Sequence, residues 1–334
     1  MSLGQYLLCN KDPLIQIVTK QHEEILPQST SITKLFRNFA AGIFEQHPPH
    51  PHIPATSQAK TIRAAFSLSE LEKRKVRWRE HKRAGLFPQE LEKPYIDKQA
   101  SLNWLKKGRL KYDDERLIIA AQDQGLMTNG FKKMAKMTQD DKCRFCHAAV
   151  ESTTHLVSSC QILLADGRYT ARHNKVCRYL HWTVCNHYNI ETGPVWLHEP
   201  KPITATPEVT IFYDKNIVLG RFVEGGAIKP DIVVWDKPKK DAKIIEVSVP
   251  SDFGINRAER EKLNKYQDLK NDLRTTWDLD SISIIPVIAG ATGLLKTNIK
   301  EYLQSIPGEP KAEEVQMAAV TGTKAILKRA LRNS

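Results

Sequence analysis

The sequence predicts an α/β fold in which a helical N-terminal half precedes a mixed central sheet flanked by helices. Between residues 168 and 189, apolar side chains recur every four positions, which is typical of a helix. After this stretch the period changes, and the runs 209–213, 217–223, 228–236 and 242–249 are rich in Val, Ile and Phe, which is typical of strands. A length of 334 residues favours about two domains.

Composition narrows the class of protein. Apolar residues make up 41% of the chain and charged residues 26%, which excludes a disordered or fibrous protein. A net charge of +12 favours an acidic partner, and nucleic acid is the common one. Six cysteines are too few for a disulfide scaffold. Because the sequence shows neither a secretory signal nor an apolar run of about 20 residues, we expect no membrane partner and a reducing compartment.

The N-terminal half divides into two predicted regions. Residues 1–58 are expected to form short helices and a linker rich in Pro and His, and residues 59–142 a basic helical region. Residues 60–85 carry nine bases and three acids, and Ser69 could cap a helix there. Such a helix suits a phosphate backbone, whereas the alternative is a solvated amphipathic helix. The candidate nucleic-acid contacts are Arg74, Lys75, Arg77, Arg79, Lys82 and Arg83.

The remaining elements follow from periodicity and from stop signals. Residues 101–138 are predicted to form a helical hairpin. The later predicted elements are helices over 256–277, 291–305 and 311–332 and a buried strand over 281–288. A basic C-terminal helix is thus expected within residues 307–334, after a sheet domain over 165–306.

A strong metal-binding motif occupies residues 143–160, CRFCHAAVESTTHLVSSC. It places Cys143, Cys146, His155 and Cys160 at the spacing C-x2-C-x8-H-x4-C. Three thiolates and one imidazole fill the shell preferred by structural Zn²⁺ and leave no open position. His147 is the competing histidine, but it adjoins Cys146 and cannot easily reach the same ion. The other cysteines, Cys9, Cys177 and Cys185, fit no such pattern and are interpreted as free thiols or core residues.

A pair of carboxylates is predicted within residues 229–250. Lys237-Pro-Lys-Lys240 makes a plausible hairpin loop, and pairing Asp236 with Asp241 would place Asp231 directly opposite Glu246. Their Cβ atoms would then lie about 5 Å apart. Like charges at this distance repel, but a divalent cation between them makes the placement tolerable. Carboxylate oxygens favour Mg²⁺ or Mn²⁺. The alternative is an ordinary, half-exposed hairpin.

The following helix offers a cation to this carboxylate pair. On a helical wheel of residues 256–277, Lys262 lies closer to the apolar stripe than Lys265 does. Lys262 could therefore reach along the sheet to the carboxylates, whereas Lys265 would face solvent or DNA. The wheel alone does not separate the two lysines firmly. The candidate catalytic set is Asp231, Glu246, Lys262 and Lys265.

Several further segments, in this order, carry a family resemblance. They include RWREHKRAGLF from Arg77, YTARHNKV over residues 169–176, KPD over residues 229–231, IIEVSVP over residues 244–250 and KLNKY over residues 262–266. Together with the cysteine–histidine motif, they resemble the C-terminal part of a LINE-like (non-LTR) retrotransposon polyprotein that bears a restriction-enzyme-like endonuclease. The resemblance runs from about Arg77 to Ile306, and no reverse-transcriptase domain is expected within this chain.

The resemblance implies a restriction-endonuclease-like fold of the PD-(D/E)xK nuclease superfamily. Asp231 and Glu246 would match its metal-binding acids. The superfamily's usual lysine position holds Ser248, so the lysine would be Lys262 or Lys265 on the next helix. The resemblance also includes Arg172 and His173, for which DNA contact and helix capping are the alternatives. It implies that the zinc knuckle handles target DNA or element RNA, and the expected location is the nucleus, or both nucleus and cytoplasm.

Two functions remain open at this stage. The first is a metal-dependent DNA endonuclease that nicks target DNA, as in target-primed reverse transcription. The alternative is a catalytically inactive nucleic-acid-binding relic or a domesticated zinc-binding interaction protein. Composition supports both. Target sequence, strand preference and oligomeric state do not follow from the sequence.

Overall fold

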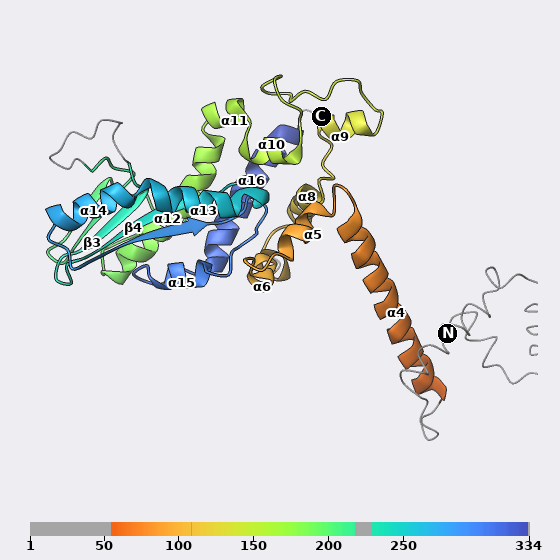
Figure 1. The fold of residues 1–334 in the computed structure, drawn as a ribbon, viewed down its shortest axis with the longest axis horizontal. Helices are drawn as coiled ribbons and strands as arrows, with labels where there is room; N and C mark the ends of the chain where they lie inside the picture. The colour runs from red at the N-terminus through yellow and green to blue at the C-terminus, as the bar shows by residue number, and fades with distance from the viewer. Residues whose placement is uncertain (1–54, 108, 218–228, 333–334) are drawn as a thin grey trace, which may run out of the picture. The chain divides into compact units, whose positions relative to one another are not determined.

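The computed structural model describes residues 55–107, 109–217 and 229–332 (Figure 1). The chain divides into two compact units, residues 1–80 and 81–334, and each is described by itself. The expectations for residues 1–54, and most of the strand expected over 217–223, fall outside the described residues. Within those ranges, no helix is both long and apolar enough to cross a membrane.

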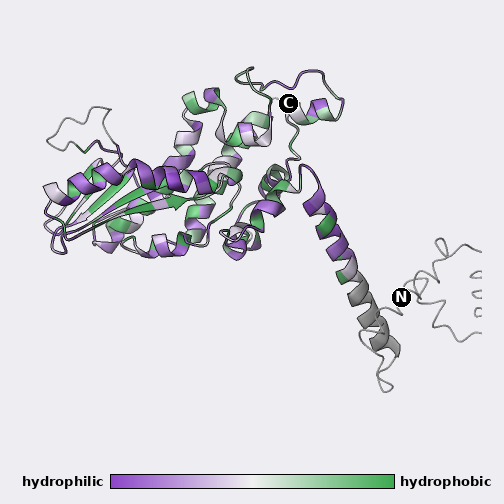
Figure 2. Cartoon of the chain, viewed as in Figure 1, coloured by the Kyte–Doolittle hydropathy of each residue, from purple (hydrophilic) through white to green (hydrophobic). Residues whose placement is uncertain are grey.

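The described part of the first unit is one long basic helix, α4 (Ala55–Glu80). This confirms the expected basic helix, but the helix begins at Ala55, so Ser69 lies in its interior and is not its N-cap. Intrahelical ion pairs join Lys73 to Glu70 at 2.9 Å and Lys75 to Glu72 at 2.6 Å. The polar colour of the last turns in Figure 2 reflects this charged surface.

The second unit is built around one five-stranded sheet in the order β1-β2-β3-β4-β5. Its strands are β1 (Ile203–Ala205), β2 (Val209–Tyr213), β3 (Ile232–Asp236), β4 (Asp241–Ser248) and β5 (Ser281–Ile288). The first three pairings are antiparallel and the β4–β5 pairing is parallel, which confirms a mixed, mainly antiparallel sheet. Asp236 pairs with Asp241, as predicted. On β5, Pro286 stands opposite Glu246. A proline has no N–H to donate to a neighbouring strand, and an edge strand such as β5 tolerates this loss.

Helices cover both faces of the sheet, because successive side chains of a strand point to opposite faces. On one face, Ile245 and Val247 of β4 belong to a core shared with α12 (Arg168–His187) and α16 (Ala312–Leu331). On the other face, Ile244 packs with the helices α13 (Ile255–Lys265) and α14 (Gln267–Thr276), which connect β4 to β5. Figure 2 shows hydrophobic colour on the strands between these helices.

Short helices and α16 complete the unit. These elements are α5 (Leu86–Leu91), α6 (Lys98–Ser101), α7 (Asn103–Lys106), α8 (Tyr112–Gln122), α9 (Asn129–Met134), α10 (Thr153–Ser158), α11 (Gln161–Ala165), η1 (Asp252–Gly254) and α15 (Ile299–Gln304). Gln316 of α16 is fully buried. Its side chain accepts the backbone N–H of Trp104 and donates to the carbonyls of Ala100 and Gly293. This single side chain therefore links α6, α7 and the loop after β5 to α16.

Three predicted helices differ from the structure. The hairpin expected over 101–138 consists of several short helices separated by turns. The helix expected over 256–277 is broken at Tyr266, whose buried ring donates its hydroxyl to the Lys229 carbonyl at 3.2 Å. Only residues 299–304 of the helix expected over 291–305 are helical. The helix expected over 311–332 is confirmed as α16.

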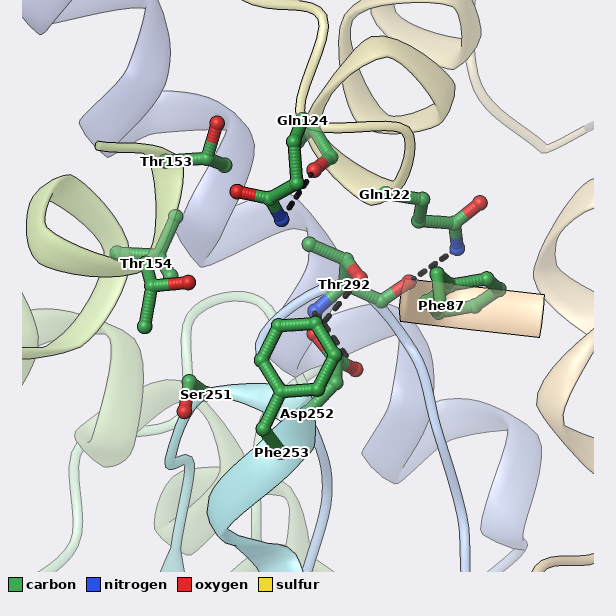
Figure 3. Close-up of a pocket in the computed structure, with 11 residues that line it drawn as sticks. Phe87, Gln122, Gln124, Thr153, Thr154, Ser251, Asp252, Phe253 and Thr292 are labelled. Carbon is green, nitrogen blue, oxygen red and sulfur yellow. Dashed lines mark hydrogen bonds between the residues drawn. The ribbon is translucent and has the colours of Figure 1, made fainter. Parts of the chain in front are cut away.

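A buried aspartate explains why the loop after β5 is not helical. Asp252 accepts the Thr292 hydroxyl at 2.7 Å and the Thr292 backbone N–H (Figure 3). It also accepts the backbone N–H of Leu294. A Cβ added at Gly290 would lie 2.3 Å from the same carboxylate, so this position requires glycine. The neighbouring cavity holds only about 10 Å³, so we interpret it as a packing gap beside this hydrogen-bonded corner.

Candidate functional site

Two acidic side chains meet across the β3–β4 hairpin. Asp231 immediately precedes β3, and Glu246 lies on β4. The Asp231 N–H donates to Glu246 Oε1 at 2.9 Å, and the Val247 N–H donates to Asp231 Oδ2 at 2.8 Å. Each carboxylate is thus held by a backbone group of the opposite segment. The hairpin register brings the two acids together, as the loop length predicted.

The geometry distinguishes the two candidate lysines. Lys262 Nζ on α13 lies 2.8 Å from Glu246 Oε2 and 3.5 Å from Asp231 Oδ2. Lys265 instead donates to the hydroxyl of Tyr266 at 3.1 Å, and its ammonium lies over that ring. Of the two lysines, Lys262 is the one whose ammonium group lies between both carboxylates.

A histidine joins the acids from the opposite side. His173 of α12 places Nε2 3.2 Å from Asp231 Oδ2. Its Nδ1 lies 3.5 Å from the buried thiol of Cys177, one turn further along the helix. The sequence suggested His173 as a DNA contact through a family resemblance, and the structure places it in direct contact with Asp231.

Glu246, Asp231 and Lys262 all have shifted pKa values. Burial, together with the charge of Asp231, raises the pKa of Glu246 to about 7, against the opposing effect of Lys262. Burial also acts to raise the pKa of Asp231, but the hydrogen bond from His173 and the nearby positive charges outweigh it, so the pKa is lowered. At Lys262, burial is outweighed by the two carboxylates, and the pKa is raised. Glu246 is therefore the acid of this pair that protonates more readily.

A cleft gives access to this group of residues. It has a volume of about 410 Å³ and is lined by side chains from α12, from β4 and its following turn, and from α13. Lys262, His173 and Asp214 line it. The Glu246 side chain is fully buried, whereas the Asp231 side chain is 15% exposed. A ligand in the cleft would therefore meet His173 and Lys262, the two side chains that contact the carboxylate of Asp231, before it reached the acids themselves.

The four residues of the cysteine–histidine motif also come together. The donor atoms of Cys143, Cys146, His155 and Cys160 all lie within 4.8 Å of one another. Cys146 Sγ is 3.3 Å from His155 Nε2, and Cys143 Sγ is 3.9 Å from Cys160 Sγ. These four residues could hold a metal ion such as zinc. The competing His147 is exposed and lies outside this group.

Local backbone geometry builds this cluster. An antiparallel bridge between Lys142 and Val150 closes the turn that carries the first two cysteines. The backbone N–H groups of Ala149 and Ala148 hold the pKa of the Cys146 thiol at about 6, which favours the thiolate that a metal requires. Burial, in contrast, raises the pKa of Cys143 to about 11. A metal ion would supply the positive charge that a buried thiolate lacks.

The predicted nucleic-acid contacts are placed unevenly. On α4, Arg74, Arg77 and Arg79 are exposed and Lys75 is partly exposed, and in the second unit Lys82 is exposed. Arg83, however, donates to the Gln124 carbonyl at 2.9 Å and lies over the Phe131 ring, so it is engaged within the second unit.

Arg172 is engaged mainly within the protein. It is 3% exposed and donates to the Thr323 hydroxyl and the Val249 carbonyl. It also lines the cleft beside Lys262, and its contact with DNA stays a prediction. Its observed contacts link α12 to α16 and to the end of β4.

Two groups of potential ligands were missed from the sequence. One is His173, Cys177 and Asp231, which meet at the acid pair, and the other is a separate buried group. His181, Cys185 and His198 are all buried, and their donor atoms lie within 4.8 Å of one another. The signal was present, because His173-x3-Cys177 is followed on the same helix by His181-x3-Cys185. His198 lies in the segment before β1 and could not be joined to them by spacing alone.

The described residues thus form two separate groups of chemical interest beyond the missed cluster around His198. One contains the Asp231–Glu246 pair with Lys262 and His173, and the other the four-residue cysteine–histidine cluster. Comparison of the sequence with models of known protein families gives no match, and comparison with curated proteins gives no significant one either.

Proposed function

We propose that this protein is a metal-dependent DNA endonuclease of retrotransposon origin, which nicks target DNA in the nucleus. The observation that carries the proposal is the pairing of Asp231 and Glu246 with Lys262, a lysine that lines the neighbouring cleft. Two carboxylates can hold a metal ion that polarises a phosphodiester, and a lysine ammonium beside them can stabilise the developing negative charge. The net charge of +12 supports a polyanionic substrate.

The donor set fits Mg²⁺ or Mn²⁺. Both donors are carboxylate oxygens, which these ions prefer. A bound ion polarises the phosphodiester and lowers the pKa of a bound water. Asp231 and Glu246 would hold it, and His173 would fix the orientation of Asp231 through the 3.2 Å contact.

Lys262 has the second role in this proposal. The residue lines the cleft and its side chain is 22% exposed, so its ammonium can approach a phosphate while remaining on the carboxylates. There it would stabilise the negative charge that develops on the scissile phosphate. Lys265, held at Tyr266, is assigned no contact with the reacting group.

Zinc is the proposed occupant of the cysteine–histidine cluster. Three sulfur atoms and one nitrogen match the closed shell of a structural zinc site. The role proposed for this zinc knuckle is to stabilise the fold next to a surface that handles target DNA or element RNA. The exposed bases of α4 would contribute phosphate contacts.

A specific observation favours the alternative, an inactive nucleic-acid-binding relic. Lys262 already pairs with both acids, and Glu246 is fully buried with a raised pKa. A metal ion must compete with this lysine and with a proton on Glu246. A relic would retain the basic surface and the zinc cluster but would not cleave.

Plasmid nicking tests the proposal. Purified full-length protein with Mg²⁺ should convert supercoiled plasmid to nicked circles, and Asp231→Ala should abolish this conversion. Asp278→Ala is the matched control, because that carboxylate is 88% exposed and bound only to the loop lysine Lys240 among the contacts described. Nicking that persists in Asp231→Ala would assign the activity elsewhere. Absence of nicking by wild-type protein that still shifts DNA in a gel would support the relic.

A further inference from the structure

A third cluster lies between α12 and the segment that leads to β1. His181 and Cys185 are four residues apart on α12 and therefore share one face of the helix. His198 approaches that face from the connecting segment. His181 Nδ1 lies 2.8 Å from His198 Nε2 and 3.5 Å from Cys185 Sγ. All three side chains are buried.

The distances suit a shared metal ion. Zinc binds imidazole nitrogen at about 2.0 Å and thiolate sulfur at about 2.3 Å, so tetrahedral donors lie roughly 3.3 to 3.6 Å apart. The sulfur–nitrogen distance of 3.5 Å is already within this range. The nitrogen–nitrogen distance of 2.8 Å is that of a hydrogen bond, and a bound ion would require it to widen by roughly 0.5 Å.

A cavity provides room for a fourth ligand. It has a volume of about 210 Å³ and is lined by all three side chains, together with Glu191 and Glu199. Three protein ligands and a water molecule in the fourth position make a complete four-coordinate zinc shell. Calcium and magnesium are poor candidates, because the protein donors are nitrogen and sulfur.

We propose that His181, Cys185 and His198 bind a second transition-metal ion, Zn²⁺, whose fourth position faces this cavity. The ion would join α12 to the segment that leads into the first strand of the sheet. Tyr213 of β2 supports the arrangement, because its ring meets the His181 ring edge-on at 5.4 Å. The site shares no residue with the acid pair or with the cluster around Cys143.

Metal content tests this proposal without measuring cleavage. Full-length protein prepared with Zn²⁺ should contain two zinc ions per chain by elemental mass spectrometry, and His198→Ala should contain one. His187→Ala is the matched control, since His187 is an exposed histidine on the same helix, and it should retain two. If the wild type contains one ion and His198→Ala contains none, the proposed site is the occupied one.

Two results would overturn the proposal. One is a folded His198→Ala protein that holds as much zinc as the wild type. The other applies if His198→Ala does not fold: a titration of metal-free wild-type protein that shows a single zinc-binding event rather than two. As a second variant, Cys185→Ser should weaken the thiolate-to-metal absorption of the cobalt-substituted protein, and unchanged absorption would contradict the assignment of Cys185.

Discussion

At the scale of single residues, Glu246 shows how a functional group can oppose stability. Its carboxyl group is fully buried on an inner strand, and burial with the charge of Asp231 raises its pKa to about 7. The folded state therefore binds a proton that the unfolded chain has released above pH 4.5. Stability from this group is highest in acid and is lost as the pH rises towards 7.

Because ionisation of Glu246 opposes folding above about pH 7, removal of its charge should stabilise the protein there. Glu246→Gln should raise the free energy of unfolding at pH 8 by about 1 to 3 kcal/mol, because ionisation of the buried carboxyl no longer opposes folding. The difference between variant and wild type should shrink as the pH falls below about 5. Urea denaturation at several pH values measures it, and a variant less stable than wild type at pH 8 would contradict it.

The same variant should lose its response to metal. Added Mg²⁺ should raise the melting temperature of the wild type, because an ion that binds only the folded state stabilises it. It should leave Glu246→Gln unchanged, since an amide cannot replace a carboxylate as an anionic ligand. Equal shifts in both proteins would place the ion elsewhere.

The two lysines of α13 allow a second residue-scale prediction. Lys262→Met should reduce nicking on the order of 100-fold, because a positioned charge near the scissile phosphate is removed. Lys265→Met, the matched control on the same helix, should cost much less, because its ammonium contacts Tyr266. Initial rates of plasmid nicking measure both, and a larger loss in Lys265→Met would reverse the assignment.

At the scale of elements, the packing of α12 against α16 depends on one glycine. A Cβ added at Gly322 would lie 2.4 Å from Arg172 Cγ and 3.0 Å from Arg172 Cα. Arg172 cannot move away easily, because it is buried and donates to the Thr323 hydroxyl and the Val249 carbonyl. Close approach of the two helices therefore requires glycine at this position.

Gly322→Ala should thus lower the free energy of unfolding by about 1 to 2 kcal/mol, since overpacking outweighs the better helix propensity of alanine. Gly193→Ala is the matched control, because nothing lies within 4 Å of its added Cβ. It should change stability by less than about 0.5 kcal/mol. Thermal unfolding measures both variants, and equal stability of Gly322→Ala and wild type would be inconsistent with this packing.

How much of each element could be predicted depended on the range of the interactions that fix it. The β3–β4 hairpin followed from its loop length and apolar strands, and with it the meeting of Asp231 and Glu246. The break at Tyr266 did not, because it depends on the Lys229 carbonyl, 37 residues earlier. The loop after β5 likewise depends on the carboxylate of Asp252.

The candidate residues divide in the same way. Asp231, Glu246 and the Cys143 cluster have local spacings that brought them out of the sequence, and a helical wheel favoured Lys262 over Lys265. The burial of Arg172 depends on α16, which lies 151 residues away at Thr323. His198 joins α12 only through the tertiary fold. Spacing along a chain does not reveal such contacts.

At the scale of the whole molecule, the cysteine–histidine cluster is part of the main core of the second unit. Cys143 and Cys160 are fully buried in the same apolar cluster as Val247 of β4 and Val320 of α16. The cysteine–histidine cluster is therefore not an appended module. Loss of its proposed ion should be felt beyond residues 143–160.

Removal of metal should consequently destabilise the whole second unit. A strong chelator should lower its free energy of unfolding by several kcal/mol, roughly 3 or more, because the free energy of metal binding stabilises only the folded state, in which the four ligands are held together. Added Zn²⁺ should restore it, whereas Mg²⁺ should not. Thermal unfolding monitored by circular dichroism measures the effect. An unchanged transition after proven removal of zinc would contradict it.

Pro286 bears on how the molecule behaves among its own copies. It lies within the edge strand β5, opposite Glu246, and its ring nitrogen has no hydrogen to donate to an added strand. A strand arriving from another chain would find the hydrogen-bond ladder interrupted at its centre. Pro286 thereby disfavours edge-to-edge pairing of the sheet with another chain at β5, the strand next to β4 and its buried Glu246.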